Sequence, residues 1–363
     1  MKVIFRADAS LQIGSGHIMR CLTQADVLKN LGAECRFICR EHTGNMIQAI
    51  RSRGYRVHTL ACHEKASSVD GQRRGELAHA HWLGSSQRED ASSCLTIIKG
   101  FSPDWLIVDH YALDVLWESA LRPYSRRLMV IDDLADREHD CDLLLDQNLG
   151  RQARDYTGLL QNKCRLLTGP KYALLRPEFV ALRDYSLNRR ANPQLRKLLI
   201  SMGGIDKDNV TGRVLETLKN CALSDDCQIS VVMGATAPWL NEVRMQIADM
   251  PWSTEVLVNV GDMARLMADS DLSIGAAGGT SWERCCMGLP ALMVVLAQNQ
   301  WPGARALQAA RAVGLLGEPN DIDSQLPQAF DTLLQGSALG EMSNSARLIT
   351  DGLGAKRVSQ ELE

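Results

Sequence analysis

Short apolar runs alternate with helix-forming stretches along the whole chain, and this alternation constrains the fold more than any other feature of the sequence. In the first half, strands are predicted at residues 3–5, 34–39, 55–60, 104–109, 127–132, 142–145 and 165–167. In the second half, strands are predicted at residues 198–202, 229–233, 255–258, 272–274 and 291–295. The helices between them are predicted at residues 17–31, 43–53, 76–83, 90–100, 208–219, 240–248, 263–268, 282–287, 305–312 and 326–334. Strands that alternate with helices favour parallel, doubly wound sheets, so an α/β fold is expected.

The length and one polar stretch predict how the chain divides into domains. A chain of 363 residues accommodates two domains of about 150–200 residues each. Residues 183–196 are polar and lack apolar periodicity, so we interpret them as a linker. We expect two Rossmann-like domains facing a cleft, at residues 1–185 and 195–345, and a C-terminal helical segment at residues 346–363. Ligands of such sheets bind beyond the carboxyl ends of the strands, which here means along the shared cleft.

Composition and charge exclude several classes of protein. The net charge of −3 gives no electrostatic case for nucleic-acid binding. The sequence has no run of about 18 apolar residues, so neither a transmembrane helix nor a membrane partner is expected. No secretion signal precedes the first strand, and the 11 cysteines are an odd number, which together favour reduced thiols. We therefore expect a soluble, cytoplasmic, monomeric protein.

The turn after the first strand offers room for a ligand and a group that can take a proton. It contains Gly14, Gly16 and His17, and glycines let the backbone turn tightly and approach a ligand. His17 falls where a helix begins, and the positive end of the helix dipole disfavours a protonated imidazole there. A neutral imidazole is a usable general base near physiological pH. A glycine-rich turn with a surface histidine is the structural alternative for this motif taken alone.

A second glycine-rich turn follows the predicted strand at residues 272–274. Gly278 and Gly279 open a helix there, so their N–H groups could hold a diphosphate, and Thr280 and Ser281 add hydroxyl donors. Glu283 accepts hydrogen bonds only, which suits the paired hydroxyls of a ribose. A tight turn with capping residues is the structural alternative.

Several polar residues lie at the predicted ends of strands in the first half, where doubly wound sheets place their ligands. Asp8, Asp109 and Tyr111 are the candidates for binding a polar sugar. A helix cap or a buried structural role is the alternative for each of them.

Two further pairs are weaker candidates in the second half. Gly203 and Gly204 end a strand and precede a helix, so their N–H groups could face the same phosphates. Asn299 and Gln300 carry amides that could bind sugar hydroxyls or acetamido groups. A plain turn and a simple cap are the respective alternatives.

Metal binding is not expected. Three Asp-x-Asp triplets begin at Asp140, Asp206 and Asp269, and such triplets can hold Mg²⁺ on a nucleotide. Each triplet falls at a predicted element boundary, where aspartate is common as a cap. No Cys-x-x-Cys motif occurs, so a zinc site is not indicated either.

Taken together, these motifs resemble one family over roughly residues 1–310, namely the UDP-sugar hydrolases of pseudaminic acid biosynthesis. The motifs that carry the resemblance are Arg6-Ala7-Asp8, Gly14-Ser15-Gly16-His17, Arg20-Cys21-Leu22, Asp109-His110-Tyr111, Ile131-Asp132-Asp133-Leu134-Ala135, Gly203-Gly204-Ile205-Asp206, Glu283 with Gly288 and Pro290, and Asn299-Gln300. The second half also looks like the donor-binding half of the lipid II-forming N-acetylglucosaminyltransferase. The resemblance therefore implies two domains of the glycosyltransferase-B type.

The resemblance further implies a reaction and the roles of particular residues. The implied reaction is the metal-independent, inverting hydrolysis of UDP-2,4-diacetamido-2,4,6-trideoxy-β-L-altropyranose by C–O cleavage, in a pathway that serves flagellin glycosylation or a surface polysaccharide. His17 matches the catalytic base of the family. Residues 278–281 and Glu283 match its UDP contacts, and Asn299 and Gln300 match its sugar-side contacts. No cofactor is implied.

Three rival functions remain open on the sequence. A UDP-sugar-dependent glycosyltransferase has the same fold, because function depends on the site rather than on the fold. A non-catalytic UDP-sugar-binding protein would use Asp8 and His17 only as sugar ligands. A Rossmann dehydrogenase is poorly supported, because Met19 stands where the dinucleotide fingerprint needs its third glycine.

Overall fold

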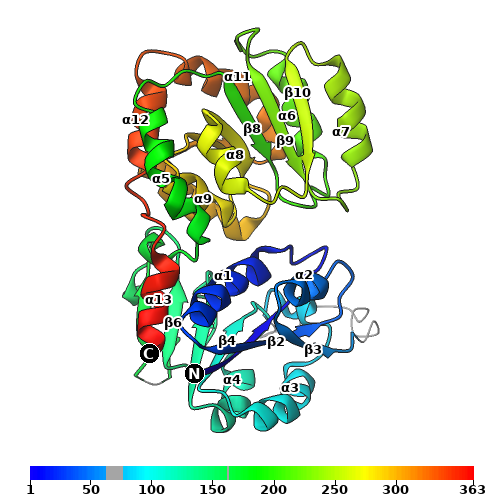
Figure 1. Ribbon diagram of the computed structural model, residues 1–363, viewed down its shortest axis with the longest axis vertical. Coiled ribbons are helices and arrows are strands. Elements are labelled where there is room, and N and C mark those ends of the chain that lie inside the picture. The colour runs from blue at the N-terminus through cyan, green and yellow to red at the C-terminus, as the bar shows by residue number, and fades with distance from the viewer. Residues whose placement is uncertain (63–76, 162) are drawn as a thin grey trace. The chain divides into compact units, whose positions relative to one another are not determined.

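The computed structural model describes residues 1–62, 77–161 and 163–363 of the chain, which fold into two compact units (Figure 1). The first unit comprises Met1–Leu174 together with Gly354–Glu363, and the second comprises Leu175–Leu353. Each unit is built on one sheet of parallel strands, and helices connect the strands. The α/β class predicted from the alternating pattern is therefore confirmed.

The sheet of the first unit has seven strands in the order β3-β2-β1-β4-β5-β6-β7. Its strands are β1 (Lys2–Ala7), β2 (Glu34–Arg40), β3 (Arg56–Leu60), β4 (Trp105–Asp109), β5 (Arg127–Ile131), β6 (Leu143–Asp146) and β7 (Arg165–Thr168). Its helices are α1 (Gly16–Asn30), α2 (Ile47–Ser52), α3 (Gln87–Phe101), α4 (Val115–Leu121) and α13 (Gly354–Leu362). Short 3₁₀ helices lie at η2 (Ala80–Leu83), η3 (Arg122–Tyr124), η4 (Ala153–Tyr156) and η5 (Pro170–Tyr172).

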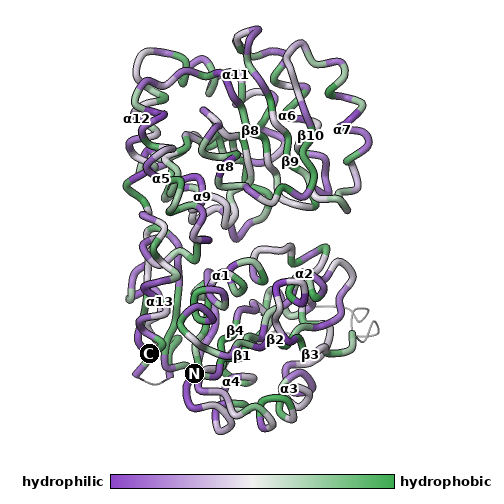
Figure 2. The backbone as a smooth tube through the Cα atoms, in the orientation of Figure 1, coloured by the Kyte–Doolittle hydropathy of each residue, from purple (hydrophilic) through white to green (hydrophobic). Residues whose placement is uncertain are grey.

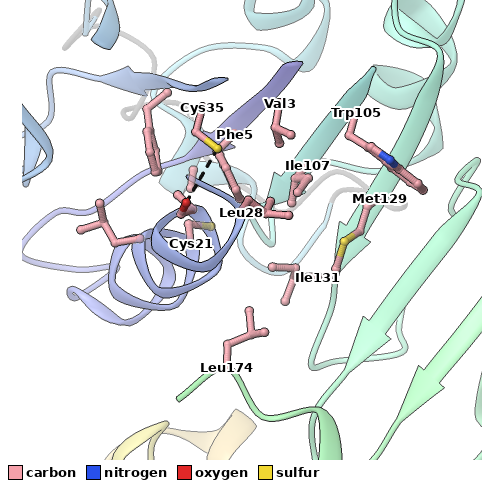
Figure 3. Close-up of a cluster of buried hydrophobic side chains, with 14 of the residues drawn as sticks. Val3, Phe5, Cys21, Leu28, Cys35, Trp105, Ile107, Met129, Ile131 and Leu174 are labelled. Atoms are coloured by element: carbon pink, nitrogen blue, oxygen red, sulfur yellow. Dashed lines mark hydrogen bonds between the residues drawn. The ribbon is translucent and has the colours of Figure 1, made fainter. Parts of the chain in front are cut away.

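Both faces of this sheet are covered, which explains why its central strands are continuous apolar runs. Val3 and Phe5 of β1 join one buried cluster, and Ile4 between them joins the cluster on the opposite face. In Figure 3, side chains of β1, β4 and β5 gather around Leu28 of α1, and Leu174 closes the same cluster. The core thus fixes α1, and with it the turn that precedes α1, against the sheet.

The C-terminal helix α13 belongs to the first unit and packs against α1 (Figure 1). The Gln24 side-chain amide donates to Ser359 Oγ at 2.7 Å, and Trp105 Nε1 donates to the carbonyl oxygen of Leu362 at 2.8 Å. The last helix therefore contributes to the core of the domain that the start of the chain builds.

The sheet of the second unit has six strands in the order β10-β9-β8-β11-β12-β13. Its strands are β8 (Lys197–Ser201), β9 (Gln228–Met233), β10 (Ser253–Val258), β11 (Leu272–Ala276), β12 (Ala291–Val294) and β13 (Gly314–Gly317). Its helices are α5 (Pro177–Arg189), α6 (Val210–Leu218), α7 (Leu240–Gln246), α8 (Met263–Asp269), α9 (Thr280–Cys286), α10 (Trp301–Ala309), α11 (Ile322–Leu333) and α12 (Ala338–Ala346). Its 3₁₀ helices are η6 (Ile247–Asp249), η7 (Gln298–Gln300) and η8 (Pro319–Asp321). Figure 2 shows β8 and β9 as largely hydrophobic, as expected for buried strands.

The linker predicted at residues 183–196 is wrong over its first half, because residues 183–189 belong to helix α5. Ser186 is fully buried and Arg190 nearly so, and the Arg190 guanidinium donates to the carbonyl oxygens of Met267 and Ser270 at the end of α8. An arginine that caps the carbonyl end of a neighbouring helix is a tertiary contact. Apolar periodicity therefore could not reveal it.

The helix predicted at residues 76–83 falls partly outside the described residues, since the structure does not describe residue 76. The described part includes only the short 3₁₀ helix η2. None of the helices in the described part of the chain is long and apolar enough to cross a membrane.

Candidate functional site

In the first unit, the carboxyl ends of β1 and β4 define the place where a ligand is expected. Strand β1 pairs with β2 on one side and with β4 on the other, with Ala7 opposite Asp109. The strand order reverses its direction between β1 and β4, and doubly wound sheets bind their ligands at such a switch point. The turn after β1 and the residues after β4 therefore meet there.

His17 and Asp109 form a close pair at this switch point. His17 Nδ1 lies 2.5 Å from Asp109 Oδ1. Asp109 is fully buried and His17 is 7% exposed. The turn that brings His17 here uses Gly14 at φ 77°, a left-handed conformation that glycine adopts without strain.

Arg20 holds the Asp109 carboxylate from the other side. Arg20 Nε lies 2.6 Å from Asp109 Oδ2, and its Nη2 lies 2.6 Å from Oδ1. Although burial opposes the charge, Arg20 and His17 hold the pKa of Asp109 well below its ordinary value. An ionised carboxylate only accepts hydrogen bonds, so His17 Nδ1 must carry the hydrogen of this contact, and in the neutral imidazole the lone pair is then on Nε2. This tautomer is the one that a general base requires.

Asp133 and Tyr111 complete the support of Arg20. Arg20 Nη1 lies 2.5 Å from Asp133 Oδ2, and the Tyr111 hydroxyl donates to the same oxygen at 2.7 Å. The Tyr111 ring meets the His17 ring edge to face, with 4.6 Å between their centroids. The two aspartates therefore fix Arg20, and the tyrosine packs against the imidazole.

Asp8 and Asp109 were both predicted to bind the sugar, but the structure buries both carboxylates completely. Asp8 Oδ1 lies 2.7 Å from Arg6 Nη1 and accepts the backbone N–H of Arg40 at 2.7 Å. Asp8 Oδ2 faces His110 Nε2 at 3.3 Å. Both carboxylates are therefore buried next to basic groups, and their role as sugar ligands stays a prediction.

An aromatic cluster beside His17 went unnoticed in the sequence. Trp82 stacks on Tyr111 with ring centroids 5.7 Å apart, and His79 lies edge-on to Trp82 at 4.4 Å. Trp82 also meets the His17 ring edge-on at 6.4 Å. Trp82 and His79 stand far from His17 in the sequence, so no local spacing links them to it. Arg20 did carry a signal, because residues three apart on a helix share one face.

Behind Asp133, a phenol hydroxyl lies between two carboxyl groups. Tyr156 Oη is 2.9 Å from Asp132 Oδ2 and 2.9 Å from Asp146 Oδ2. A hydroxyl has one hydrogen, so Tyr156 donates to one carboxyl at a time, and a proton on the other carboxyl completes the second hydrogen bond. Burial and the nearby charge of Asp133 raise the pKa of Asp146 to about 7, although Arg151 Nε at 2.5 Å opposes this.

This cluster predicts that stability falls as the pH rises. The folded-state pKa of Asp146, about 7, exceeds the ordinary value of 3.8. Its contribution is therefore present at low pH and is lost as the pH rises through 7. Relative to the Asp146→Asn variant, the wild type should lose about 2–3 kcal/mol of unfolding free energy between pH 5 and pH 8. Urea titrations of both proteins at the two pH values test this, and a constant difference between them would contradict it.

In the second unit, the glycine-rich segments meet at the corresponding switch point. Strand β8 lies between β9 and β11, and Ser201 at the end of β8 pairs with Gly275 of β11. Gly204 and Gly278 therefore follow neighbouring strand ends. A Cβ atom at Gly204 would meet nothing within 4 Å, and one at Gly278 would meet only Gln300 Nε2 at 4.0 Å. The packing of the chain thus leaves open space at these backbone positions.

The hydroxyl and carboxylate candidates around this turn have different surroundings. The Ser281 hydroxyl donates to the carbonyl oxygen of Gly278 at 2.6 Å, so it stabilises the turn. Thr280 is partly exposed. Glu283 Oε1 lies 3.6 Å from Arg176 Nη2, and burial raises the pKa of Glu283 above its ordinary value. The N–H groups that precede helix α9 have no acceptor within that helix.

The remaining candidate residues of the second unit also differ in their burial and hydrogen bonding. Gln300 Oε1 accepts the N–H of Leu296 at 2.9 Å, and its amide nitrogen faces Gly278. Asn299 is exposed. Gly203 lies at φ 96°. The helix predicted at residues 208–219 begins at Val210, and its first N–H groups donate to the carboxylate of Asp206.

The Asp-x-Asp triplets serve the fold. Asp206 caps α6, Asp142 pairs with Arg122, and Asp271 accepts the backbone N–H groups of Arg196 and Lys197. Among residues 1–62, 77–161 and 163–363, no group of three histidine, cysteine, aspartate or glutamate side chains is arranged to hold a metal ion.

Comparison with solved structures confirms a two-domain fold of the glycosyltransferase-B type. MurG of Acinetobacter baumannii superimposes with a TM-score of 0.69 at 16% identity, and each chain is covered to 99%. The spinosyn rhamnosyltransferase SpnG in complex with thymidine diphosphate gives a TM-score of 0.66 at 16% identity, with full coverage of both chains (100%). No family model matches the sequence.

Sequence relatives confirm the resemblance to the UDP-sugar hydrolases of pseudaminic acid biosynthesis. The UDP-2,4-diacetamido-2,4,6-trideoxy-β-L-altropyranose hydrolase of Campylobacter jejuni is 27% identical over 271 residues, which are 75% of this chain and 83% of the relative. An uncharacterised protein of Methanocaldococcus jannaschii is 26% identical over 304 residues, 83% of this chain and 56% of the relative. The spore coat polysaccharide biosynthesis protein SpsG of Bacillus subtilis is 28% identical over 208 residues, 56% of this chain and 60% of the relative. The match thus spans a little over half the length of the last two.

Proposed function

We propose that this protein hydrolyses UDP-2,4-diacetamido-2,4,6-trideoxy-β-L-altropyranose to UDP and the free diacetamido sugar. The observation that carries the proposal is the His17–Asp109–Arg20 group at the switch point of the first sheet. With Nδ1 bonded to Asp109, the neutral imidazole has its lone pair on Nε2, which is what activation of a water molecule requires. The relative from Campylobacter jejuni supports the choice of substrate.

In this proposal the reaction inverts the anomeric carbon and cleaves the C–O bond. His17 Nε2 takes a proton from water while the water oxygen bonds to the anomeric carbon on the face opposite UDP. The bond from that carbon to the glycosyl oxygen breaks, and its electron pair leaves with UDP. Diphosphate is a stabilised leaving group, so the carboxylic acid that most glycosidases need can be absent.

We further propose that the first unit supplies the base and the sugar contacts, while the second unit supplies the UDP contacts. Tyr111, Trp82 and His79 offer apolar ring surface beside His17 for the sugar. The turn at Gly278 and Gly279 offers N–H groups for the diphosphate, and Glu283 offers an acceptor for the ribose.

One prediction tests the diphosphate turn separately from catalysis. Gly278→Ala adds a methyl group into space that the chain leaves open, so folding should be unchanged. If the diphosphate contacts this backbone, the methyl group should weaken UDP binding by about tenfold or more. Gly261→Ala is the matched control, because that glycine is equally open and lies after the edge strand β10. Calorimetric titration of UDP measures both, and equal affinities would remove Gly278 from the site.

A UDP-sugar-dependent glycosyltransferase is the second candidate, because the fold neighbours MurG and SpnG favour it. The two functions differ in whether UDP release needs an acceptor. Release should be measured from the proposed substrate without an acceptor and with EDTA present. Rapid release, with ¹⁸O from labelled water found on the sugar and not on UDP, is expected for the hydrolase. UDP binding without release would reject hydrolysis and direct the search to an acceptor.

A further inference from the structure

The guanidinium group of Arg284 is packed within the glycine-rich turn of the second unit. Its Nη2 donates to the carbonyl oxygen of Ala276 at 2.7 Å and to Ser281 Oγ at 3.2 Å. Arg284 is only 2% exposed. A Cβ atom at position 275 would collide with the guanidinium, so Gly275 is what makes room for it. The sequence of the turn thus accommodates a buried arginine.

Among the described residues, no carboxylate lies within ion-pair distance of Arg284, and only the charges of Glu283 and of the Cys285 thiol act on it from further away. Arg6, Arg40 and Arg137 are also deeply buried, and each meets an aspartate within 2.8 Å. Arg190, like Arg284, donates to backbone carbonyls and forms no ion pair among the described residues. Glu283, the neighbour of Arg284 in sequence, contacts Arg176 instead. Nε of Arg284 has no hydrogen-bond partner among the described residues.

A buried charge without an ion pair is costly, and a bound anion can compensate it. Burial lowers the pKa of Arg284 to about 10, which still leaves the group protonated at neutral pH. The guanidinium lies where β8 and β11 end, next to Ser201 and Gly275. It therefore supplies positive charge at the switch point, under the open backbone of Gly278 and Gly279.

We propose that Arg284 is a positioning residue for the diphosphate of the nucleotide sugar. Its charge compensates the anion that binds to the turn, and its hydrogen bonds to Ala276 and Ser281 hold the turn in shape for that anion. The inference rests on the proposed function, because it takes the turn as the diphosphate site. The inference gives Arg284 a role in binding the diphosphate and does not change the role proposed for His17 in the first unit.

The test compares UDP with uridine on the full-length protein. Wild type, Arg284→Lys and Arg284→Gln are titrated with each ligand by calorimetry, and uridine is also measured by competition. In Arg284→Gln, UDP affinity should fall by about 10–100-fold, because the low dielectric of the interior strengthens the lost attraction, while uridine affinity should stay the same. Arg284→Lys keeps the charge and should restore most of the UDP affinity.

A control separates this role from a purely structural one. The Arg183 guanidinium also donates to backbone carbonyl oxygens of the second unit, namely those of Cys286, Thr350 and Arg347. Arg183→Gln should leave the preference for UDP over uridine unchanged.

Equal losses of UDP and uridine affinity in Arg284→Gln, or no loss of either, would overturn the inference and leave the proposed function standing. A wild-type protein that does not bind UDP would overturn both. If Arg284→Gln does not fold, UDP affinity near that of wild type in Arg284→Lys supports the charge, and a loss of tenfold or more in that variant overturns it.

Discussion

Replacing His17 by alanine is expected to lower kcat for UDP release by about 10²–10⁴-fold, the usual contribution of a general base. The physical reason is the tautomer that Asp109 enforces, which leaves Nε2 as the free proton acceptor of this group. UDP affinity should be little changed, because the proposed UDP contacts lie in the second unit. Single-turnover assays with the proposed substrate measure the chemical step directly.

Two additions make the His17 experiment specific. Added imidazole should recover part of the activity of His17→Ala, because the cavity left by the side chain can admit a small base. His58→Ala is the matched control, since His58 lies on β3, the edge strand of the same sheet. Turnover of His17→Ala equal to that of wild type would remove His17 from the mechanism.

Replacing Asp109 by asparagine is expected to lower kcat by about 10²–10⁴-fold, comparable to the loss of the aspartate in a serine protease triad. The asparagine amide can donate to His17 Nδ1, which forces the hydrogen onto Nε2 and removes the lone pair that takes the proton. Arg20 would keep Asp133 as its partner, at 2.5 Å from Nη1.

The ¹⁵N chemical shifts of His17 report this change without substrate. Wild type should show hydrogen on Nδ1, and Asp109→Asn should show it on Nε2. Asp26→Asn is the control, because Asp26 lies on α1, the helix that carries His17, and its carboxylate bonds to Arg53 and Tyr55 rather than to the histidine. An Asp109→Asn variant that retains both the wild-type tautomer and wild-type kcat would reject the positioning role of Asp109.

Much of the fold could be predicted because it rests on local patterns. A strand buried on both faces reads as a continuous apolar run, as β4 does, and parallel strands need helices between them. The elements that the sequence did not predict have a weak local pattern or are stabilised by tertiary contacts. Strand β13 is short and bounded by glycines, and helix α5 is covered through arginine contacts rather than through an apolar stripe.

Part of the site was also predictable from the sequence. The sequence placed His17 and Asp109 separately, each near the end of a strand where doubly wound sheets bind ligands, and the strand order of the structure then shows that they meet. The separate roles of the two side chains could not be predicted from the sequence. Whether an aspartate binds a ligand or orients a histidine depends on which groups occupy its oxygens, and Arg20 and His17 occupy those of Asp109.

The sequence by itself determined the class of fold, the positions of the two glycine-rich turns and the candidate base, because each depends on residues close together in the chain. Only the tertiary structure decided three further points: that Asp8 and Asp109 are fully buried, that Trp82 lies next to His17, and that Arg284 forms no ion pair among the described residues. Burial and charge pairing are properties of packed neighbours distant in sequence, and packing alone brings those neighbours together.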